Sequence, residues 1–275
     1  MELVRVDTQR AYELLWEKIT TLELAPGAPV NEQKLAQELS MGTVPVREAL
    51  RVLAHENLVR ITPRHGLYVA DVDVADLERI SEIRLSLESL CARLAAQRAT
   101  PDDLVVLEAL RQEQADIARA SADIARASAD IARASADIAR ASADIADIDS
   151  ASVRASAAVS PEDSRRLFEL DHKFHQALAK AARNKYLAQT LDRLFGLSRR
   201  LWYLALPHMG YLPAAVEEHL ELVDAIRAGD ADGAAQIMYE HVAAFYAKVR
   251  ETLSAQERKA DIDPASADID LASGD

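Results

Sequence analysis

Apolar residues recur at helical spacing along most of the chain and predict a mainly α-helical protein. Helices are expected at residues 9–22, 32–40 and 44–58, the second of them capped by Asn31. A strictly alternating pattern then surrounds a Pro-Arg-His-Gly turn at residues 63–66 and predicts a β-hairpin. Three helices followed by a hairpin are the layout of a winged helix-turn-helix, which places its third helix in the major groove of DNA.

From residue 73 onward the pattern is helical throughout, which predicts a second, all-helical domain. The residues at the C-terminus are small and acidic, a composition typical of disorder. The expected domains are a winged helix-turn-helix at residues 1–72, a helical domain at residues 73–255 and a disordered tail at residues 256–275. The helices expected in the second domain cover about 74–98, 101 onward, 161–182, 185–206, 213–228 and 231–255.

One segment of the second domain repeats the heptad ADIARAS four times from Ala115 to Ser142, and a decayed copy continues to about Ala158. Its period places one isoleucine per heptad near one helical face, starting at Ile117. The segment is either a helical extension that forms a weak coiled coil or a repeat expansion tolerated in a surface connection. One isoleucine per heptad is a thin seam, so the second interpretation is favoured.

Composition narrows the class of protein. The chain has 275 residues, enough for two domains with separate cores, and its single cysteine excludes an internal disulfide framework. No apolar run approaches the roughly 18–20 residues that span a bilayer, and the N-terminus lacks the apolar core of a signal peptide. A cytoplasmic protein with no membrane partner is therefore expected. The net charge of −13 argues against a surface broadly covered in nucleic-acid contacts.

The local charge of the winged helix differs from that of the whole chain. Residues 44–70 contain four arginines and only two glutamates, so this segment has a net positive charge. Arg47 and Arg51 share one face of the third helix, and Arg64 lies in the turn of the hairpin. For two arginines four residues apart alone, a solvated helix face is the better explanation, but their place in the whole winged unit favours contact with DNA.

Five polar residues interrupt apolar stripes of the second domain. Asp171 and His175 lie four residues apart in one stripe, and His219, His241 and Arg84 each interrupt another. An unpaired buried polar group costs on the order of 1–3 kcal/mol, so these helices are expected to aim such groups at one another. Three imidazoles and one carboxylate suit a divalent metal, with Zn²⁺ as the expected ion and Mn²⁺, Ni²⁺ or Fe²⁺ as alternatives. Histidines with ordinary hydrogen-bond partners in the core are the competing explanation.

The winged helix resembles the DNA-binding domain of the GntR family of bacterial transcription regulators over roughly residues 8–70. The resemblance rests on APGAPVNEQKLAQEL and on TVPVREALRVLAHENLVRITPRHGLYV, above all on Pro-Val-Arg-Glu-Ala-Leu at residues 45–50. Gly42-Thr43 and Gln33 depart from the family pattern, which removes two potential contacts and lowers the expected salt dependence by about one unit of slope each. The resemblance implies that DNA is contacted by Lys34, Thr43, Val44, Pro45, Arg47, Arg51, Arg64, His65 and Gly66.

The second domain resembles the FCD (FadR-like C-terminal) ligand-binding domain over about residues 73–255, with the ADIARAS repeat as an insertion. The resemblance rests on Asp171-x3-His175, on His219 in EEHLELVDAIRAGD and on His241 in AAQIMYEHV. In metal-containing members of that family these positions bind a metal at the centre of an antiparallel helical bundle. Four protein ligands leave one or two coordination positions open, and the resemblance implies a small organic or sugar acid as effector.

Arg84 is the candidate counter-charge for that carboxylate, because a guanidinium binds carboxylates in a bidentate manner. The alternative is an internal ion pair between Arg84 and Glu88.

These observations predict a non-enzymatic, metabolite-responsive transcription regulator that binds a palindromic operator in double-stranded DNA as a homodimer. Two other functions stay open. A metal-dependent hydrolase would use the same ion to activate water, but the sequence offers no further Glu or His in an obvious general-base role, and it would leave the DNA-binding domain unexplained. A bundle with a purely structural metal would bind no effector.

Overall fold

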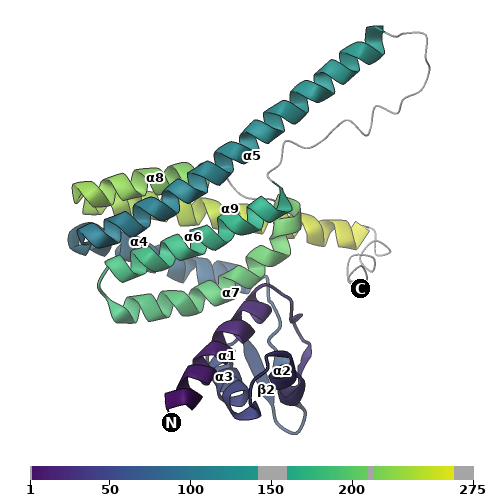
Figure 1. The fold of residues 1–275 in the computed structure, drawn as a ribbon, viewed down its shortest axis with the longest axis vertical. Helices are drawn as coiled ribbons and strands as arrows, with labels where there is room; N and C mark the ends of the chain where they lie inside the picture. Colours follow the sequence, from purple (N-terminus) through teal and green to yellow (C-terminus); the bar gives the residue numbers. More distant parts are fainter. Residues whose placement is uncertain (1, 142–159, 210–212, 263–275) are drawn as a thin grey trace. The chain divides into compact units, whose positions relative to one another are not determined.

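The computed structural model describes residues 2–141, 160–209 and 213–262. Within them lie nine helices and three short strands, which confirms the mainly α-helical fold (Figure 1). In chain order they are α1 (Glu2–Thr20), β1 (Pro29–Val30), α2 (Glu32–Glu38), α3 (Thr43–His55), β2 (Val59–Thr62), β3 (Gly66–Val69), α4 (Asp76–Arg98), α5 (Pro101–Ala141), α6 (Pro161–Ala181), α7 (Lys185–Met209), α8 (Pro213–Ala228) and α9 (Ala231–Ile262).

The N-terminal elements form the predicted winged helix-turn-helix. Its core is an apolar cluster in which α3 buries Val46, Leu50 and Leu53, spaced three and four residues apart, against Leu15 and Ile19 of α1. The spacing places these side chains on one face of each helix, so the opposite face of α3 is left for solvent or a partner.

The wing is a three-stranded antiparallel sheet in the order β1-β3-β2. The sequence pattern predicts the hairpin but misses β1, in which Pro29 and Val30 pair with Tyr68 and Leu67. Two residues beside a Pro-Gly turn are too few to show an alternating pattern, so this strand is visible only through its pairing.

The predicted helix starts at two proline positions are confirmed. At the start of α5, the Thr100 backbone N–H donates to Asp103 Oδ2 at 2.9 Å, and the Asp103 N–H donates to Thr100 Oγ1 at 3.3 Å. At the start of α6, Ser160 accepts a hydrogen bond from the Asp163 N–H at 2.9 Å. Each cap satisfies backbone donors that the first helical turn leaves unpaired.

Helix α5 extends into the repeat, where the sequence left the end of the helix open, and helix α9 extends beyond its expected end at residue 255. Helix α5 continues from the bundle through the ADIARAS repeat to Ala141, past α6 and α8 in Figure 1. Ile117 is partly buried, whereas the Ile124 side chain is 65% exposed. The decayed copy at 142–158 lies outside the described residues. Helix α9 continues to Ile262, into the segment expected to be a tail.

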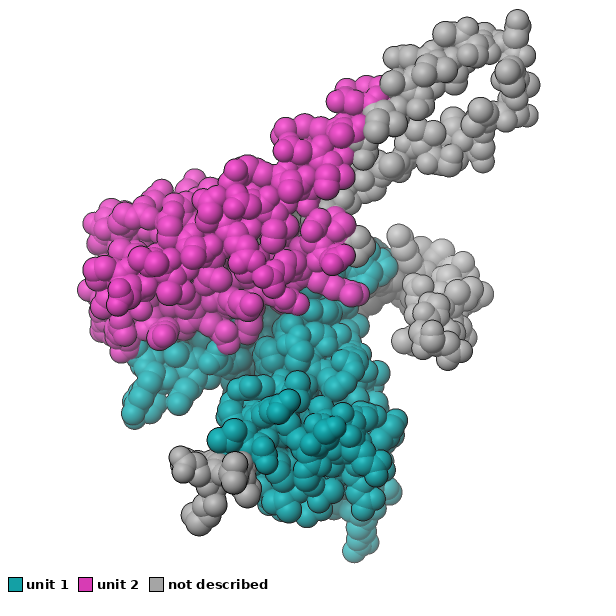
Figure 2. Space-filling model, in the orientation of Figure 1, with its two compact units in different colours: residues 1–88, 184–209, 242–275 teal, residues 89–183, 210–241 magenta. Residues whose placement is uncertain are grey.

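The chain forms two compact units (Figure 2). The first comprises residues 1–88, 184–209 and 242–275, and the second comprises residues 89–183 and 210–241. The first unit extends beyond the domain boundary expected at residue 72. Within this unit, Arg199 of α7 donates to both carboxylate oxygens of Glu17 on α1, at 2.5 and 2.7 Å. None of the helices within the described residues combines the length and apolar character that a membrane-spanning segment needs.

Candidate metal centre and nucleic-acid interface

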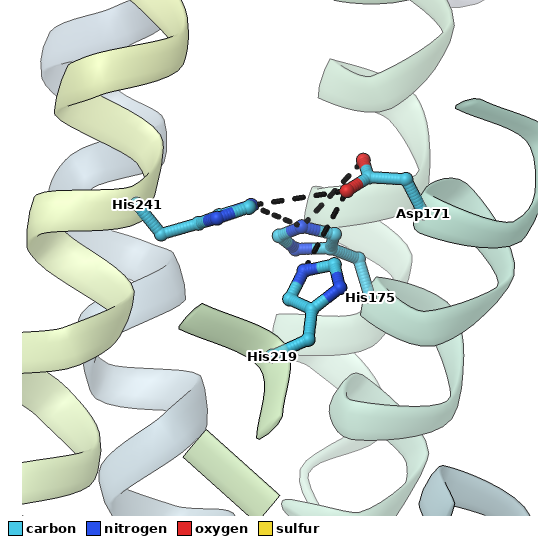
Figure 3. Close-up of side chains that lie close together, drawn as sticks. All are labelled: Asp171, His175, His219 and His241. Carbon is cyan, nitrogen blue, oxygen red and sulfur yellow. Dashed lines mark hydrogen bonds and ion pairs between the residues drawn. The ribbon is translucent and has the colours of Figure 1, made fainter. Parts of the chain in front are cut away.

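Helices α6, α8 and α9 bring four potential metal ligands together within the second unit (Figure 3). Asp171 and His175 lie one turn apart on α6, His219 lies on α8, and His241 lies on α9. One ligand atom from each residue lies within 4.8 Å of all the others. The four residues are four of the five polar residues that interrupt apolar stripes in the sequence, and the fifth, Arg84, is not among them.

The separations between ligand atoms suit one shared ion. Two atoms that each lie about 2.1 Å from an ion, at about 90–110° to each other, are roughly 3.0–3.4 Å apart. The Nε2 atoms of His175 and His241 are 3.2 Å apart, and His219 Nε2 lies 3.5 Å from Asp171 Oδ1. His241 Nε2 lies 3.9 Å from the same oxygen. Small side-chain shifts would therefore bring all four atoms within bonding distance of one cation.

The environment keeps at least one of these histidines in the form that binds metals. His175, His219 and His241 are all buried, and Asp171 is partly exposed. Burial, and then the neighbouring His241 and His175, lower the pKa of His219 well below its ordinary value. A lowered pKa means a neutral imidazole at pH 7, and a neutral imidazole offers a lone pair to a cation.

Two residues outside the ligand set orient the imidazoles. His241 Nδ1 lies 2.7 Å from Glu218 Oε2, and His219 Nδ1 lies 2.9 Å from Gln114 Oε1. A carboxylate or amide oxygen accepts a hydrogen bond, so each Nδ1 acts as the donor and each Nε2 faces the cluster as the atom that can bind a cation. The ring of Phe174 also stacks on that of His219, with centroids 4.1 Å apart.

Glu218 and Gln114 are not among the site residues predicted from the sequence. Glu218 stands in a charged stretch, Glu-Glu-His, where a carboxylate gives no signal of its own. Gln114 does give one, since it follows the buried Leu107 by seven residues on α5 and so lies on the same helical face. A polar residue on that face indicates an inward-pointing group.

Glu218→Ala is expected to weaken Zn²⁺ binding by about 10–100-fold, because His241 loses the acceptor that fixes its tautomer and ring orientation. Competition with a chelating indicator dye measures the change. Glu217→Ala is the matched control, because Glu217 is the exposed preceding residue and carries the same charge. Equal Zn²⁺ affinities in the two variants would show that Glu218 does not support the centre.

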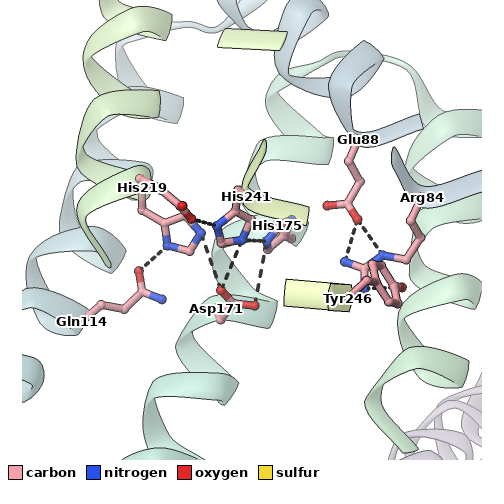
Figure 4. A network of polar contacts seen from close by, with 9 residues as sticks. Arg84, Glu88, Gln114, Asp171, His175, His219, His241 and Tyr246 are labelled. Atoms are coloured by element: carbon pink, nitrogen blue, oxygen red, sulfur yellow. Dashed lines mark hydrogen bonds and ion pairs between the residues drawn. The ribbon is translucent and has the colours of Figure 1, made fainter. Parts of the chain in front are cut away.

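Arg84 lies in the first unit and forms the internal ion pair that the sequence offers as an alternative (Figure 4). Its Nε donates to Glu88 Oε1 at 2.6 Å, and its Nη1 donates to Tyr246 Oη at 3.0 Å. The guanidinium also lies over the ring of Phe195, 4.2 Å from the centroid. The role of Arg84 as counter-charge for an effector stays a prediction.

The second candidate site is the exposed surface of α3 and the wing. Of the residues proposed to contact DNA, Pro45 is buried in the winged-helix core and supports α3 from inside. The Arg47 side chain donates to Glu32 Oε2 at 2.8 Å, and the Arg51 side chain donates to Glu48 Oε1 at 2.7 Å. The remaining proposed contacts are exposed: Lys34, Thr43, Val44, Arg47, Arg51, Arg64, His65 and Gly66.

The tip of the wing has a backbone that holds its side chains outward. Arg64 and Gly66 both have positive φ angles, of 67° and 105°, and the Tyr68 hydroxyl donates to the His65 carbonyl at 3.1 Å. Positive φ is readily adopted only by glycine, so Gly66 permits the tight turn that presents Arg64.

Comparison with known families matches both parts of the chain. Residues 7–69 match the family described as bacterial regulatory proteins, gntR family. Residues 79–142 and 129–244 match the FCD domain, and these two stretches overlap inside the ADIARAS repeat. The break between the two matched stretches thus falls within the repeat, where an insertion in the domain is expected.

Individual relatives cover most of the chain. The HTH-type transcriptional repressor RspR of Escherichia coli K12 is 25% identical over 244 residues, which cover 88% of this chain and 89% of RspR. The HTH-type transcriptional regulator McbR of the same organism is 25% identical and covers 81% of this chain and 85% of its own. A solved structure of E. coli McbR/YncC has a TM-score of 0.66 at 20% identity and covers 89% of this chain and 97% of its own.

Proposed function

We propose that this chain, which belongs to the GntR family of bacterial regulatory proteins and carries an FCD domain, senses a small carboxylate through a bound metal. The chain is a transcriptional regulator of this type with a DNA-binding domain. In the proposal, its helical part binds a divalent metal, with Zn²⁺ as the expected ion and Mn²⁺, Ni²⁺ or Fe²⁺ as alternatives, and the bound metabolite modulates operator binding.

The convergence of Asp171, His175, His219 and His241 supports the metal. These four residues would hold the ion, which would supply a Lewis-acidic anchor for an oxygen ligand. Three neutral imidazoles, one carboxylate and a divalent cation sum to a charge of about +1. The Glu218 carboxylate beside His241 offsets that charge. The preference for a small organic acid therefore rests on the open coordination position, where a divalent cation attracts an oxygen anion more strongly than a neutral or cationic group.

The DNA-binding part is proposed to act in a homodimer. Two copies related by a two-fold axis place two α3 helices in successive major grooves of a palindromic operator, about 34–36 Å apart. A carboxylate that favours one spacing of the two helices would shift operator affinity by the same free energy as its preference for that spacing.

Fluorescence anisotropy on labelled DNA from the protein's own promoter tests the whole proposal. With Zn²⁺ bound, operator affinity is expected to change when a small carboxylate is added, and a chelator is expected to remove that response. DNA binding that ignores every carboxylate, together with a melting temperature lowered by chelator, would indicate a purely structural metal. Chelator-sensitive turnover of generic esters would indicate the hydrolase instead.

Arg64→Ala is expected to reduce the slope of log affinity against log salt by about 0.9, since one phosphate contact is lost from the wing. Anisotropy titrations between about 50 and 200 mM salt give the slope. Arg79→Ala is the charge-matched control, because Arg79 is exposed on α4, outside the winged helix. If both substitutions change the slope equally, the effect of Arg64→Ala comes from the net charge of the protein and not from a lost phosphate contact.

A further inference from the structure

Gln114 is a buried amide that only half satisfies its hydrogen-bonding groups. It lies on α5, its side chain is fully buried, and Oε1 is bound to His219 Nδ1 at 2.9 Å. Its Nε2 is also buried and has no hydrogen-bond partner within the part of the chain that the structure describes. A buried donor left unpaired costs about 1–3 kcal/mol, so this nitrogen favours a ligand that accepts a hydrogen bond from it.

The position of Gln114 is fixed by contacts between α5 and α6, the helix that carries Asp171 and His175. Arg166 of α6 pairs with Glu113 of α5 at 2.6 Å, next to Gln114 in sequence. Seven residues further along α5, the Ser121 hydroxyl donates to Asp163 of α6 at 3.0 Å. These contacts to α6 lie on both sides of Gln114 along α5. Figure 4 shows its amide beside His219 of the ligand cluster.

The two ends of this amide have opposite chemistry and suit two tasks. The oxygen can only accept, so it keeps the proton on His219 Nδ1 and leaves Nε2 free to bind a cation. The nitrogen can only donate, and it is attached to the same carbon as the oxygen that touches His219. A donor in that place complements an oxygen anion that is bound beside the histidine.

We propose that Gln114 is a positioning and specificity residue of the metal centre: its Oε1 orients His219, and its Nε2 donates a hydrogen bond to a carboxylate oxygen bound at the open coordination position. This inference rests on the proposed metal site. In this proposal two groups bind the carboxylate: the metal ion, through its charge, and the neutral amide of Gln114, through a hydrogen bond.

Two substitutions separate the two tasks. Gln114→Leu removes both the acceptor and the donor, and Zn²⁺ affinity is expected to fall by about 10–100-fold. Gln114→Glu at pH 8 keeps an acceptor for His219 but removes the donor, so Zn²⁺ affinity is expected to stay within a few-fold of wild type. The matched control is Gln112→Leu, which alters an exposed amide of the same helix.

Carboxylate binding is read with Co²⁺ in place of Zn²⁺, because its visible absorption reports the ligands of the ion. Titration of the wild-type Co²⁺ protein with acetate is expected to change the spectrum in a saturable manner, and equal chloride is expected to leave it unchanged. Gln114→Glu is expected to weaken the acetate response by about 10-fold or more, which corresponds to one lost hydrogen bond to a charged acceptor.

The outcomes distinguish this inference from the proposed function. A wild-type protein that binds neither Zn²⁺ nor Co²⁺ overturns both. A wild-type protein that binds metal, with Gln114→Leu binding Zn²⁺ equally well, overturns only the orienting role. An acetate response that is absent in wild type, or unchanged in Gln114→Glu, overturns only the donor role.

Discussion

Replacing His219 with alanine is expected to weaken Zn²⁺ binding by at least about 100-fold, because one of four ligands is lost from a buried site. At a free Zn²⁺ concentration of 100 times the wild-type dissociation constant, the metal stabilises the wild-type fold by about 2.7 kcal/mol. The same concentration would stabilise the variant by only about 0.4 kcal/mol. Thermal unfolding with and without Zn²⁺ measures the difference directly.

Two further variants serve as controls for this experiment. His172→Ala removes a histidine from α6 that is not among the four converging residues, and it is expected to keep the full stabilisation by Zn²⁺. Asp171→Asn changes the carboxylate to an amide of the same shape, and it is expected to lose metal without leaving a cavity. Stabilisation by Zn²⁺ that survives in both His219→Ala and Asp171→Asn would mean that the ion binds elsewhere.

Glu88→Ala is expected to destabilise the fold by about 3–5 kcal/mol, because it leaves the Arg84 guanidinium buried without its counter-charge. Arg84 is 5% exposed and Glu88 is 1% exposed, so water cannot replace the lost carboxylate. Urea unfolding gives the cost as the change in unfolding free energy. Glu82→Ala is the control, since Glu82 is an exposed carboxylate on the same helix and its loss is expected to cost under about 0.5 kcal/mol.

The double variant Arg84→Met/Glu88→Leu is expected to recover most of that loss, since apolar side chains of similar volume can replace a buried ion pair. It also isolates the predicted effector role of Arg84. A regulator whose effector is held by Arg84 would lose its response to carboxylates in this stable variant. An unchanged response would assign Arg84 to the ion pair alone. If Glu88→Ala lowers the free energy of unfolding no more than Glu82→Ala does, the ion pair between Arg84 and Glu88 contributes little to stability.

The fold could be predicted from the sequence where side-chain periodicity carries the information. Helix α3 shows its buried face through Val46, Leu50 and Leu53. The hairpin shows its alternation through Val59 and Ile61 in one strand and through Leu67 and Val69 in the other. Strand β1 could not be predicted, because its two residues are defined by pairing across the sheet rather than by local pattern. Long-range pairing of this kind leaves no periodic trace in a short segment.

The candidate ligands could be predicted because they differ from the apolar residues around them, whereas Glu218 could not, because its neighbours are also charged. A histidine inside an apolar stripe, such as His219 or His241, contradicts its surroundings and therefore attracts attention. Glu218 lies among other charges and is unremarkable until the structure places it 2.7 Å from His241. The inward position of Arg84 is evident in the sequence, whereas its ion pair with Glu88 is only one of the two pairings that the sequence allows.

The long rod of α5 gives the ADIARAS repeat an evolutionary consequence. The repeat consists of identical seven-residue units, so the gain or loss of whole copies changes its length in steps of seven residues. Seven residues complete two helical turns to within about 20° and add about 10.5 Å of length. A change of one copy would thus lengthen or shorten the rod while every remaining side chain kept nearly the same bearing around its axis. Length at this position can drift among descendants without disturbing Gln114 or the four residues that it adjoins.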